Sequence, residues 1–333
     1  MSVTIKDVAK KAGVAPSTVS RVIANNPSIS LKTKEKVRKV MAELKYYPNA
    51  NAQGLASNRS RTFGLILPSA SDAFYQNPFF PTVVRGINYA MSKHDYSILI
   101  SSGHTTEHRL NHLQKIVYGK QVEGLIFLYA SKNDPLLEFA LNDGIPTVVI
   151  GSPNNQKVHL VDNDNEKIGE MVTNHLIEEG CKNIAYIGGD MEQYFILDRL
   201  KGYKKALKDH KLNFNEEYIY NDLVFLPVDG YKLAQETLDL ELFDGFVIAD
   251  ELVADGVQQA LLEKELSHIK TITFKSYESQ LHNPHMKESY INLNTHLLGS
   301  RAVNILFDSL NRGKDSSQRY IHEYVDGEMI VTP

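Results

Sequence analysis

Over residues 4–46, apolar side chains recur every three or four positions, which is the spacing of amphipathic helices. Turn and cap residues divide this stretch into three short helices. Gly13 ends the first, Pro16 opens the second and Ser30 caps the third. Each helix then has one apolar stripe that can face its neighbours. The pattern predicts a three-helix mini-domain at residues 1–48.

A different pattern begins at Phe63. Short runs that are apolar throughout alternate with stretches of ordinary helix length. Continuous apolar strands separated by helices are typical of parallel sheets that helices cover on both faces. The length of residues 62–333 suggests two such lobes, so we predict an α/β fold in which doubly wound parallel sheets follow the helical head. The predicted strands are 63–67, 96–101, 124–129, 146–150, 184–188, 245–249 and 271–274.

Residues 49–61 between these regions are small, polar and basic, which is typical of a linker. A helix of under about 12 residues is marginal in water. Gly54 would destabilise a helix in this linker by about 1 kcal/mol relative to alanine. We therefore expect this linker to be ordered only when a partner holds it.

Charge divides the chain in the same place. Residues 1–61 hold 12 Lys and Arg against 3 Asp and Glu, whereas the remainder holds 24 against 37. A basic head on an acidic body places any contact with nucleic acid at the N-terminus. The alternative for a charge run alone is a solvated face.

Other signals are weak or absent. Cys181 is the one cysteine, so a disulfide framework is excluded and a reducing cytoplasm fits. The apolar runs are shorter than the roughly 18 residues that a membrane span needs, and the first residues lack an apolar signal core. His104, His108 and His112 recur at a spacing of four, but no Glu completes an HExxH motif. We expect no metal, no cofactor and no membrane contact.

The head itself carries a specific motif. In TIKDVAKKAGVAPSTVSRVI, a supporting helix, a turn with Gly13 and a second helix have the geometry of a helix-turn-helix that enters the major groove. Ser17, Thr18 and Arg21 face the bases in this interpretation, and Arg can bond guanine with two donors. A generic three-helix bundle is the alternative. The residues expected at phosphate are Lys6, Lys10, Lys32, Lys34 and either Ser30 or Thr33.

These segments, with SISLKTKEKVRKVMAELKYYPN and NANAQGLAS, resemble the lactose-repressor (LacI/GalR) family. The resemblance covers the whole chain and implies a sequence-specific transcription regulator with two lobes of periplasmic-binding-protein type. It also implies that the linker becomes a hinge helix on DNA, with Leu55 wedged into the minor groove. The DNA-binding residues it assigns are Thr4, Pro16, Ser17, Thr18, Arg21, Ser30, Thr33, Asn49, Ala52 and Leu55.

The same resemblance places an effector in the cleft between the lobes, beyond the carboxyl ends of the strands. Aromatic side chains with hydroxyl-pairing neighbours suit a sugar. For the two phenylalanines in NPFF, packing in the core is the alternative. The family usually carries an acid pair where this chain reads Phe274-Lys275-Ser276. The effector-binding residues assigned are Asp72, Phe79, Phe80, Arg199, Phe225, Asp250 and Ser276.

The runs SDAFYQNPFF, VYGKQVEGLIFLYA, LVDNDN and GCKNIAYIGGD more narrowly resemble maltose-operon repressors of Gram-positive bacteria. This implies a homodimeric repressor that maltose or a related glucoside releases from operator DNA. A regulator of another carbohydrate operon, or a catabolite-control regulator with a phosphoprotein co-repressor, remains an alternative. A sugar-binding or sugar-modifying protein fits less well, because it needs no basic head.

The resemblance also sets boundaries. The head is expected at 1–48, the hinge at 49–61 and the effector-binding and dimerisation part at 62–333. Within that part, lobe 1 is expected at about 62–161 and 293–319, and lobe 2 at about 162–292 and 320–333.

Overall fold

The computed structural model describes residues 3–47, 59–68, 76–101, 103, 105–131, 133–153, 157–276, 289–312 and 320–331. The chain divides into two compact units, Met1–Arg61 and Thr62–Pro333, and each is described by itself. Four residues with an assigned role lie outside the described residues, namely Asn49, Ala52, Leu55 and Asp72. The same holds for Gly54 of the linker and for His104.

The first unit has three helices, as the periodicity predicts: α1 (Ile5–Ala12), α2 (Pro16–Ile23) and α3 (Leu31–Glu43). One valine from each helix is wholly buried, and Val8, Val19 and Val37 form the centre of the core. Burying such side chains is the main favourable term in so small a unit. The three predicted helices are confirmed.

Local hydrogen bonds explain where these helices begin and end. The Thr4 backbone N–H donates to Asp7 Oδ2 at 2.8 Å, and the Thr33 N–H donates to Ser30 Oγ at 3.2 Å. Both bonds satisfy polar groups at a helix start. Gly13 has a φ of 63°, a left-handed conformation that glycine adopts without strain. The turn between α1 and α2 is therefore a sharp one.

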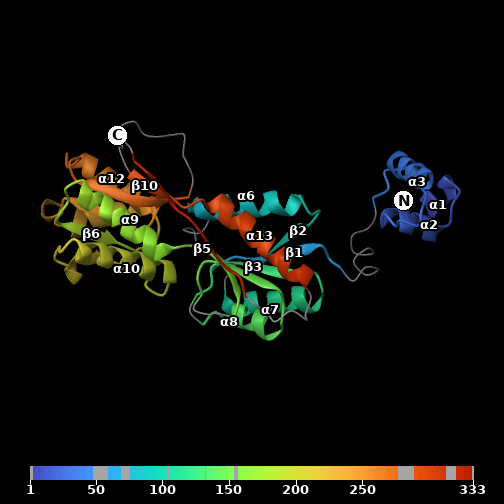
Figure 1. Ribbon diagram of the computed structural model, residues 1–333, viewed down its shortest axis with the longest axis horizontal. Coiled ribbons are helices and arrows are strands. Elements are labelled where there is room, and N and C mark those ends of the chain that lie inside the picture. Colours follow the sequence, from blue (N-terminus) through green and yellow to red (C-terminus); the bar gives the residue numbers. More distant parts are fainter. Residues whose placement is uncertain are drawn as a thin grey trace. The chain divides into compact units, whose positions relative to one another are not determined.

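Lobe 1 of the second unit is built on a six-stranded parallel sheet in the order β11-β5-β4-β3-β1-β2. Its strands are β1 (Thr62–Ile66), β2 (Ser97–Ser101), β3 (Gly124–Leu128), β4 (Thr147–Ile150), β5 (His159–Asn163) and β11 (His322–Val325). Helices α6 (Phe79–Ser92) and α13 (Thr295–Arg312) cover one face (Figure 1). Helices α7 (Thr106–Tyr118) and α8 (Pro135–Asn142) cover the other.

Lobe 2 has a second six-stranded sheet in the order β12-β10-β9-β8-β6-β7, in which only the β10–β12 pair is antiparallel. Its strands are β6 (Ile184–Ile187), β7 (Ile219–Tyr220), β8 (Gly245–Ile248), β9 (Lys270–Lys275), β10 (Ser289–Asn292) and β12 (Glu328–Ile330). Helices α9 (Asn165–Glu178) and α10 (Tyr194–Asp209) pack on one face. Helices α11 (Pro227–Lys232) and α12 (Glu251–Glu263) pack on the other. The predicted α/β fold with two parallel-sheet lobes is confirmed.

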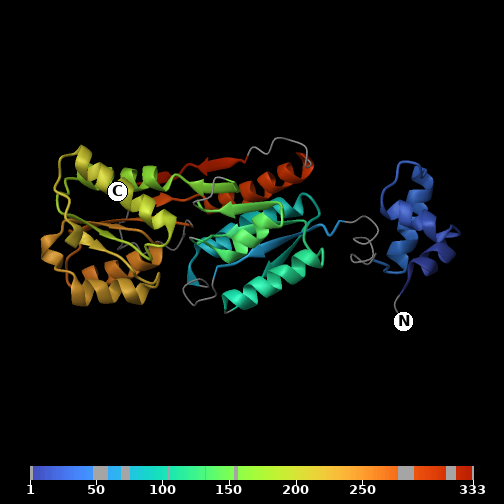
Figure 2. The same cartoon turned by 90° about the horizontal axis from the view of Figure 1, so that it is seen from below.

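The chain passes between the lobes three times, after β5, after β10 and after β11. The third crossing differs from the prediction. We expected it near 320, but β11 pairs with β5 and so belongs to lobe 1 (Figure 2, red beside green). Likewise the first crossing follows Asn163 rather than 161, because β5 continues to that residue. These strands escaped prediction because they are short and partly polar.

One buried amide joins the three crossings. The Asn163 Nδ2 group donates to the Leu293 carbonyl at 3.1 Å and to the Val325 carbonyl at 2.8 Å. Asn163 ends β5, Leu293 follows β10 and Val325 ends β11. Asn163 is 3% exposed, so water could not replace its amide as the hydrogen-bond donor to these two carbonyls. The amide therefore holds the three connecting segments together.

Candidate functional site

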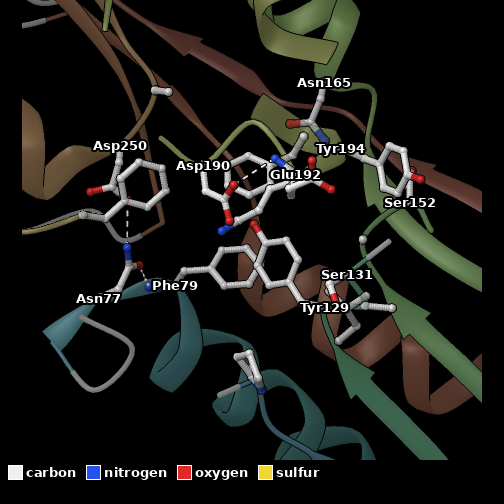
Figure 3. A pocket seen from close by; sticks show the side chains of 18 of the residues that line it. Asn77, Phe79, Tyr129, Ser131, Ser152, Asn165, Asp190, Glu192, Tyr194 and Asp250 are labelled. Carbon is white, nitrogen blue, oxygen red and sulfur yellow. Dashed lines mark hydrogen bonds between the residues drawn. The ribbon is translucent and has the colours of Figure 1, made fainter. Parts of the chain in front are cut away.

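A cavity of about 600 Å³ lies between the two lobes of the second unit, at the carboxyl ends of strands from both sheets. Open parallel sheets leave their loops and helix starts at this edge, which is where ligands bind. Asn77 and Phe79 reach it from lobe 1, and Asp250 reaches it from lobe 2 (Figure 3). Its size and its mixture of apolar and polar side chains are those of a small-molecule site.

An aromatic cluster forms one wall of the cavity. The Phe79 ring lies 5.4 Å from Phe80 in an edge-to-face arrangement and 6.2 Å from Tyr129. The cluster continues into lobe 2, since Phe195 lies 5.2 Å from Tyr129 and 6.2 Å from Phe225. Phe79 and Phe80 also pack against the hydrophobic core of lobe 1. The two phenylalanines therefore line the cavity and also pack in the core, so the two alternatives considered for them are compatible.

Arg199 of α10 lies against this cluster and is 5% exposed. Its Nε donates to Asn165 Oδ1 at 3.0 Å, and its Nη1 donates to the Ala249 carbonyl at 2.6 Å. The guanidinium lies 4.0 Å from the centre of the Phe274 ring. Its Nη2 makes no hydrogen bond to the described part of the chain. A rigid guanidinium with one unused donor group on a cavity wall can bind a ligand oxygen.

A buried carboxyl, Asp162, lies at the end of β5. Its oxygens accept hydrogen bonds from Ser152 Oγ at 2.9 Å, from the Asn163 N–H at 2.8 Å and from Asn165 Nδ2 at 3.2 Å. Burial raises the pKa of Asp162 to about 6, against an ordinary value of 3.8, although these donors and Arg199 act in the opposite direction. Asn165 bonds both Asp162 and Arg199, so it links the carboxyl to the guanidinium.

Asp250 begins helix α12 and is similarly engaged. Its Oδ1 accepts the N–H groups of Leu252 at 2.9 Å and of Val253 at 3.4 Å, and its Oδ2 accepts from Asn77 Nδ2 at 2.7 Å. Burial raises the pKa of Asp250 above its ordinary value, while these bonds lower it. The carboxyl is thus held by its own helix and by the opposite lobe.

Ser276 lies beside this carboxyl, just after β9. Its backbone N–H donates to Glu251 Oε1 at 3.0 Å, and its carbonyl accepts from Thr295 Oγ1 at 2.7 Å. Burial raises the pKa of Glu251 to about 7. The backbone of Ser276 is therefore committed to structure, although the residue also lines the cavity.

The structure brings the assigned effector residues together, except for Asp72, which is outside the described residues. Phe79, Phe80, Arg199, Phe225, Asp250 and Ser276 all line the one cavity. Sequence reasoning missed most of the other lining residues, among them Asn77, Tyr129, Ser152, Asp162 and Asn165. A usable signal existed for some of them, because polar residues that directly follow an apolar strand lie at the carboxyl edge of a parallel sheet.

The first unit presents the predicted polar face on α2. Pro16, Ser17 and Arg21 are exposed and Thr18 is half-buried. Arg21 makes no hydrogen bond or ion pair within the described residues, so its guanidinium is available. Exposed Ser20 lies on the same helix and was not assigned.

Lys34 corrects one expectation. We expected it to contact phosphate, but it is 9% exposed and its Nζ donates to the carbonyl and side-chain oxygens of Asn25 at 3.2 and 3.1 Å. These bonds fasten α3 to the loop after α2. Thr4, Ser30 and Thr33 lie at helix starts, and Ser30 Oγ is 2.9 Å from Thr33 Oγ1.

Neither a metal centre nor a membrane span is found in the described parts of the chain. No group of three or more His, Cys, Asp or Glu side chains there could hold a metal. His112 is exposed on α7, and its Nδ1 lies 3.1 Å from Ser101 Oγ. None of the described helices is long and apolar enough to cross a membrane.

Comparison with known proteins identifies both units. The model for bacterial regulatory proteins of the lacI family matches residues 4–49, and the model for periplasmic binding proteins and the sugar-binding domain of the LacI family matches residues 60–321. The HTH-type transcriptional regulator MalR of Streptococcus pneumoniae is 41% identical over 331 residues, which cover 99% of each chain.

Solved structures agree with this assignment. The transcriptional regulator CelR in complex with cellobiose superposes with a TM-score of 0.74 at 25% identity, over 99% of each chain. The operator-bound lac repressor dimer has a TM-score of 0.83 at 23% identity, over 100% of this chain and 98% of that one. The second likeness concerns the fold alone.

Proposed function

The chain belongs to the lacI family of bacterial regulatory proteins and is a DNA-binding transcription regulator rather than an enzyme; from that premise we propose that it represses genes for the use of maltose or related α-glucosides. In this proposal the protein binds operator DNA without sugar, and the sugar releases it. The extent of the match to MalR supports the choice of sugar class, since it spans 99% of both chains.

Helix α2 is the proposed reading element. Arg21 is exposed and has no partner in the described part of the head, so it can give two donors to a guanine edge. Ser17 and Thr18 lie on the preceding turn and can pair with several base edges. Pro16 lacks a polar group and can offer only an apolar contact. Thr4, Ser30 and Thr33 are proposed to position the head on phosphates, with Lys6 adding charge.

The linker completes the proposed DNA interface. Asn49 and Ala52 would contact the operator, and Leu55 would enter the minor groove at its centre. An apolar wedge that unstacks a base step can offset the ordering of a short helix. Two copies are needed, because each head reads one half of a near-palindromic site. We therefore propose a homodimer, which is also the state named for the lac repressor.

The cavity between the lobes is the proposed effector site, and one observation carries that proposal. Aromatic rings and a buried guanidinium with an unused Nη2 lie on the same wall. A pyranose presents apolar C–H faces to such rings and hydroxyl oxygens to such a donor. Cellobiose, the ligand in the CelR structure, is likewise a glucose disaccharide. Asp250 and Asp162 supply acceptors for sugar hydroxyls.

Release then follows from a change in population. A sugar that binds one arrangement of the lobes more tightly shifts the protein towards it. In that arrangement the paired hinges would be spaced unsuitably for the operator. The sugar would then lower the affinity for DNA by the same factor by which DNA lowers the affinity for the sugar. The three crossings near Asn163 are where the lobes turn.

An operator gel shift across a sugar panel tests this function. We expect a complex with the upstream region of an α-glucoside operon, dissociated by maltose or maltotriose and unaffected by cellobiose or sucrose. Release by a different sugar would assign the protein to another carbohydrate operon. A complex that no sugar affects but a phosphoprotein strengthens would favour a catabolite-control role. Light scattering that gives a monomer with and without operator would contradict the dimer.

A further inference from the structure

Most helices that begin at the cavity already have a side-chain acceptor of this chain at their first turn. Asp134 Oδ1 accepts the N–H groups of Leu136 and Leu137 at the start of α8, at 2.8 and 3.4 Å. Asp250 does the same for α12. In other α/β proteins these N–H groups bind ligand phosphates. Here carboxylates of the chain occupy that role.

The start of α10 lacks a side-chain cap, but acidic residues precede it. Asp190 and Glu192 both line the cavity and are exposed to it, and Asp190 Oδ1 accepts the Glu192 N–H at 2.9 Å. The carboxylate of Glu192 makes no hydrogen bond within the described residues. Figure 3 shows both carboxylates among the side chains that line the cavity.

The charges that line the cavity are unequal. Six carboxyl groups face two guanidinium groups, and the described lining residues include neither lysine nor histidine. The carboxyl groups are those of Asp134, Asp162, Asp190, Glu192, Asp222 and Asp250. Without the two most buried carboxyl groups, Asp162 and Asp250, four carboxyl groups still face two guanidinium groups. Among the described lining residues carboxyl groups therefore outnumber guanidinium groups, which favours a negative potential at this part of the cavity.

The two guanidinium groups are largely committed. Arg199 uses Nε and Nη1 for Asn165 and Ala249, and it interacts electrostatically with Asp162 and Asp250. Arg109 donates from Nη2 to the Leu67 carbonyl at 2.6 Å, and its buried Nε has no hydrogen-bond partner among the residues that the structure describes. One donor group on each arginine is enough to bond a hydroxyl, but the surrounding carboxylates offset the charge that a phosphate would require.

We propose that this cleft selects uncharged sugars and rejects their phosphate esters, and that the carboxylate caps together with Glu192 are specificity determinants. The inference deepens the proposed function, because it names the chemical form of the effector at the same site. The regulator would then sense sugar that has entered the cell unmodified, or that a phosphatase or hydrolase has freed of phosphate. Like charges opposed in a recognition site reduce affinity by about 100-fold or more.

Isothermal titration of the full chain tests the selectivity. The probes are maltose, trehalose and cellobiose, each paired with its 6-phosphate, and the readout is the ratio of the two dissociation constants within a pair. We expect the phosphate ester of any sugar that binds to bind about 100-fold more weakly. Raising the salt from about 0.05 M to about 0.5 M should narrow this gap, because exposed carboxylates are screened. Rejection by shape alone would not respond to salt.

A matched pair of variants locates the effect. Glu192→Gln removes one cavity charge and should narrow the gap by about threefold to tenfold. Glu216→Gln makes the same charge change on lobe 2 outside the cavity lining, and should leave the ratio as in the parent protein. Because each ratio is taken within one variant, a general change in affinity does not affect it.

The outcomes separate this inference from the proposed function. Failure of maltose to bind while another uncharged disaccharide binds would overturn the proposed effector but support the charge selectivity. A phosphate ester that binds as tightly as its parent would overturn the selectivity, whichever operon the protein controls. If Arg109→Gln then removed that binding, the phosphate would be placed at the Arg109 guanidinium.

Discussion

Asn77 and Asp250 join the two lobes directly, through a hydrogen bond of 2.7 Å between residues 173 positions apart in the sequence. Both side chains are buried, at 6% and 9% exposure. Asn77 also accepts the Phe79 N–H at 2.9 Å, so the same amide orients the start of α6 and its aromatic residues. A ligand that took Asp250 Oδ2 would compete with Asn77, which couples sugar binding to a contact between lobes.

A double-mutant cycle measures this coupling. Asn77→Ala and Asp250→Ala should each destabilise the second unit, and the double variant should be more stable than the sum of the two losses predicts. A bond to an ionised group is worth about 1.5–3 kcal/mol, so we expect an interaction energy of that order from urea unfolding. An interaction energy near zero would show that the bond does not link the lobes in solution.

We expect the side-chain amide of Asn163 to make a large contribution to the free energy of unfolding. Asn163→Asp keeps the shape but removes the donors to Leu293 and Val325 and places a carboxyl beside two carbonyls. We expect a loss of about 2–4 kcal/mol in the free energy of unfolding. Asn294→Asp is the matched control, since its amide bonds the Asp326 carbonyl at the same crossings but in an exposed position. Equal losses in the two variants would contradict the role assigned to Asn163.

The buried carboxyl of Asp162 predicts a pH dependence. Its pKa is raised by burial from 3.8 to about 6, so the native state binds the proton more tightly than the unfolded chain does. The tighter proton binding therefore adds up to about 3 kcal/mol to the free energy of unfolding. This contribution is fully present below about pH 4 and is lost as the pH rises to about 6. Urea unfolding across this range should show stability falling with pH.

Asp162→Asn provides the comparison for that experiment. The variant should be less stable overall because it loses acceptors, but its stability should depend less steeply on pH. Glu251, with a pKa raised to about 7 by burial, acts with the same sign and should leave a residual slope. A slope as steep as that of the parent protein would assign the dependence to other groups.

Arg21 and Lys6 are expected to differ in how they act on DNA. Arg21→Ala should weaken operator binding by about 1–3 kcal/mol and reduce discrimination at one base pair. Lys6→Ala should weaken binding to operator and to unrelated DNA alike, and should lower the salt slope by about one. Fluorescence anisotropy at several salt concentrations distinguishes the two. A uniform loss for Arg21→Ala would remove it from base reading.

Arg199→Lys should separate sugar response from DNA binding. The lysine keeps the positive charge but has no planar fork to bond Asn165, Ala249 and a ligand together. We expect sugar affinity to fall at least about 10-fold while the sugar-free protein still binds operator. A gel shift with increasing maltose would then show a complex that persists. Parallel loss of operator binding would indicate general misfolding instead.

The fold was largely predictable because its main strands are buried on both faces. All five residues of β3 are buried, and a short, continuously apolar run is typical of a strand that is covered on both faces. β5, β7, β10, β11 and β12 were missed for physical reasons. β7 has two residues, and β11 pairs with β5 across 162 positions, a relation that no local pattern contains.

The site was predictable only in part. Arg199, Phe225 and Asp250 were found because the resemblance to a family marks them. Asn77 was missed, since its role depends on a partner in the other lobe. Asp162 and Asn165 stand in LVDNDN, directly after an apolar strand, and the rule that such residues lie at the carboxyl edge would have found them. The sequence could not reveal that carboxylates cap the helices facing the cavity.

The three crossings have a further consequence for how such proteins diversify. Each lobe is assembled from separated stretches of the chain. After β10 of lobe 2 the chain returns to lobe 1 for α13 and β11, and it then ends in lobe 2 with β12. No single cut in the gene can therefore exchange one lobe for another. The head is one uninterrupted stretch and can be recombined whole. New operators can arise by shuffling, whereas new sugars must be reached by point substitutions around the cleft.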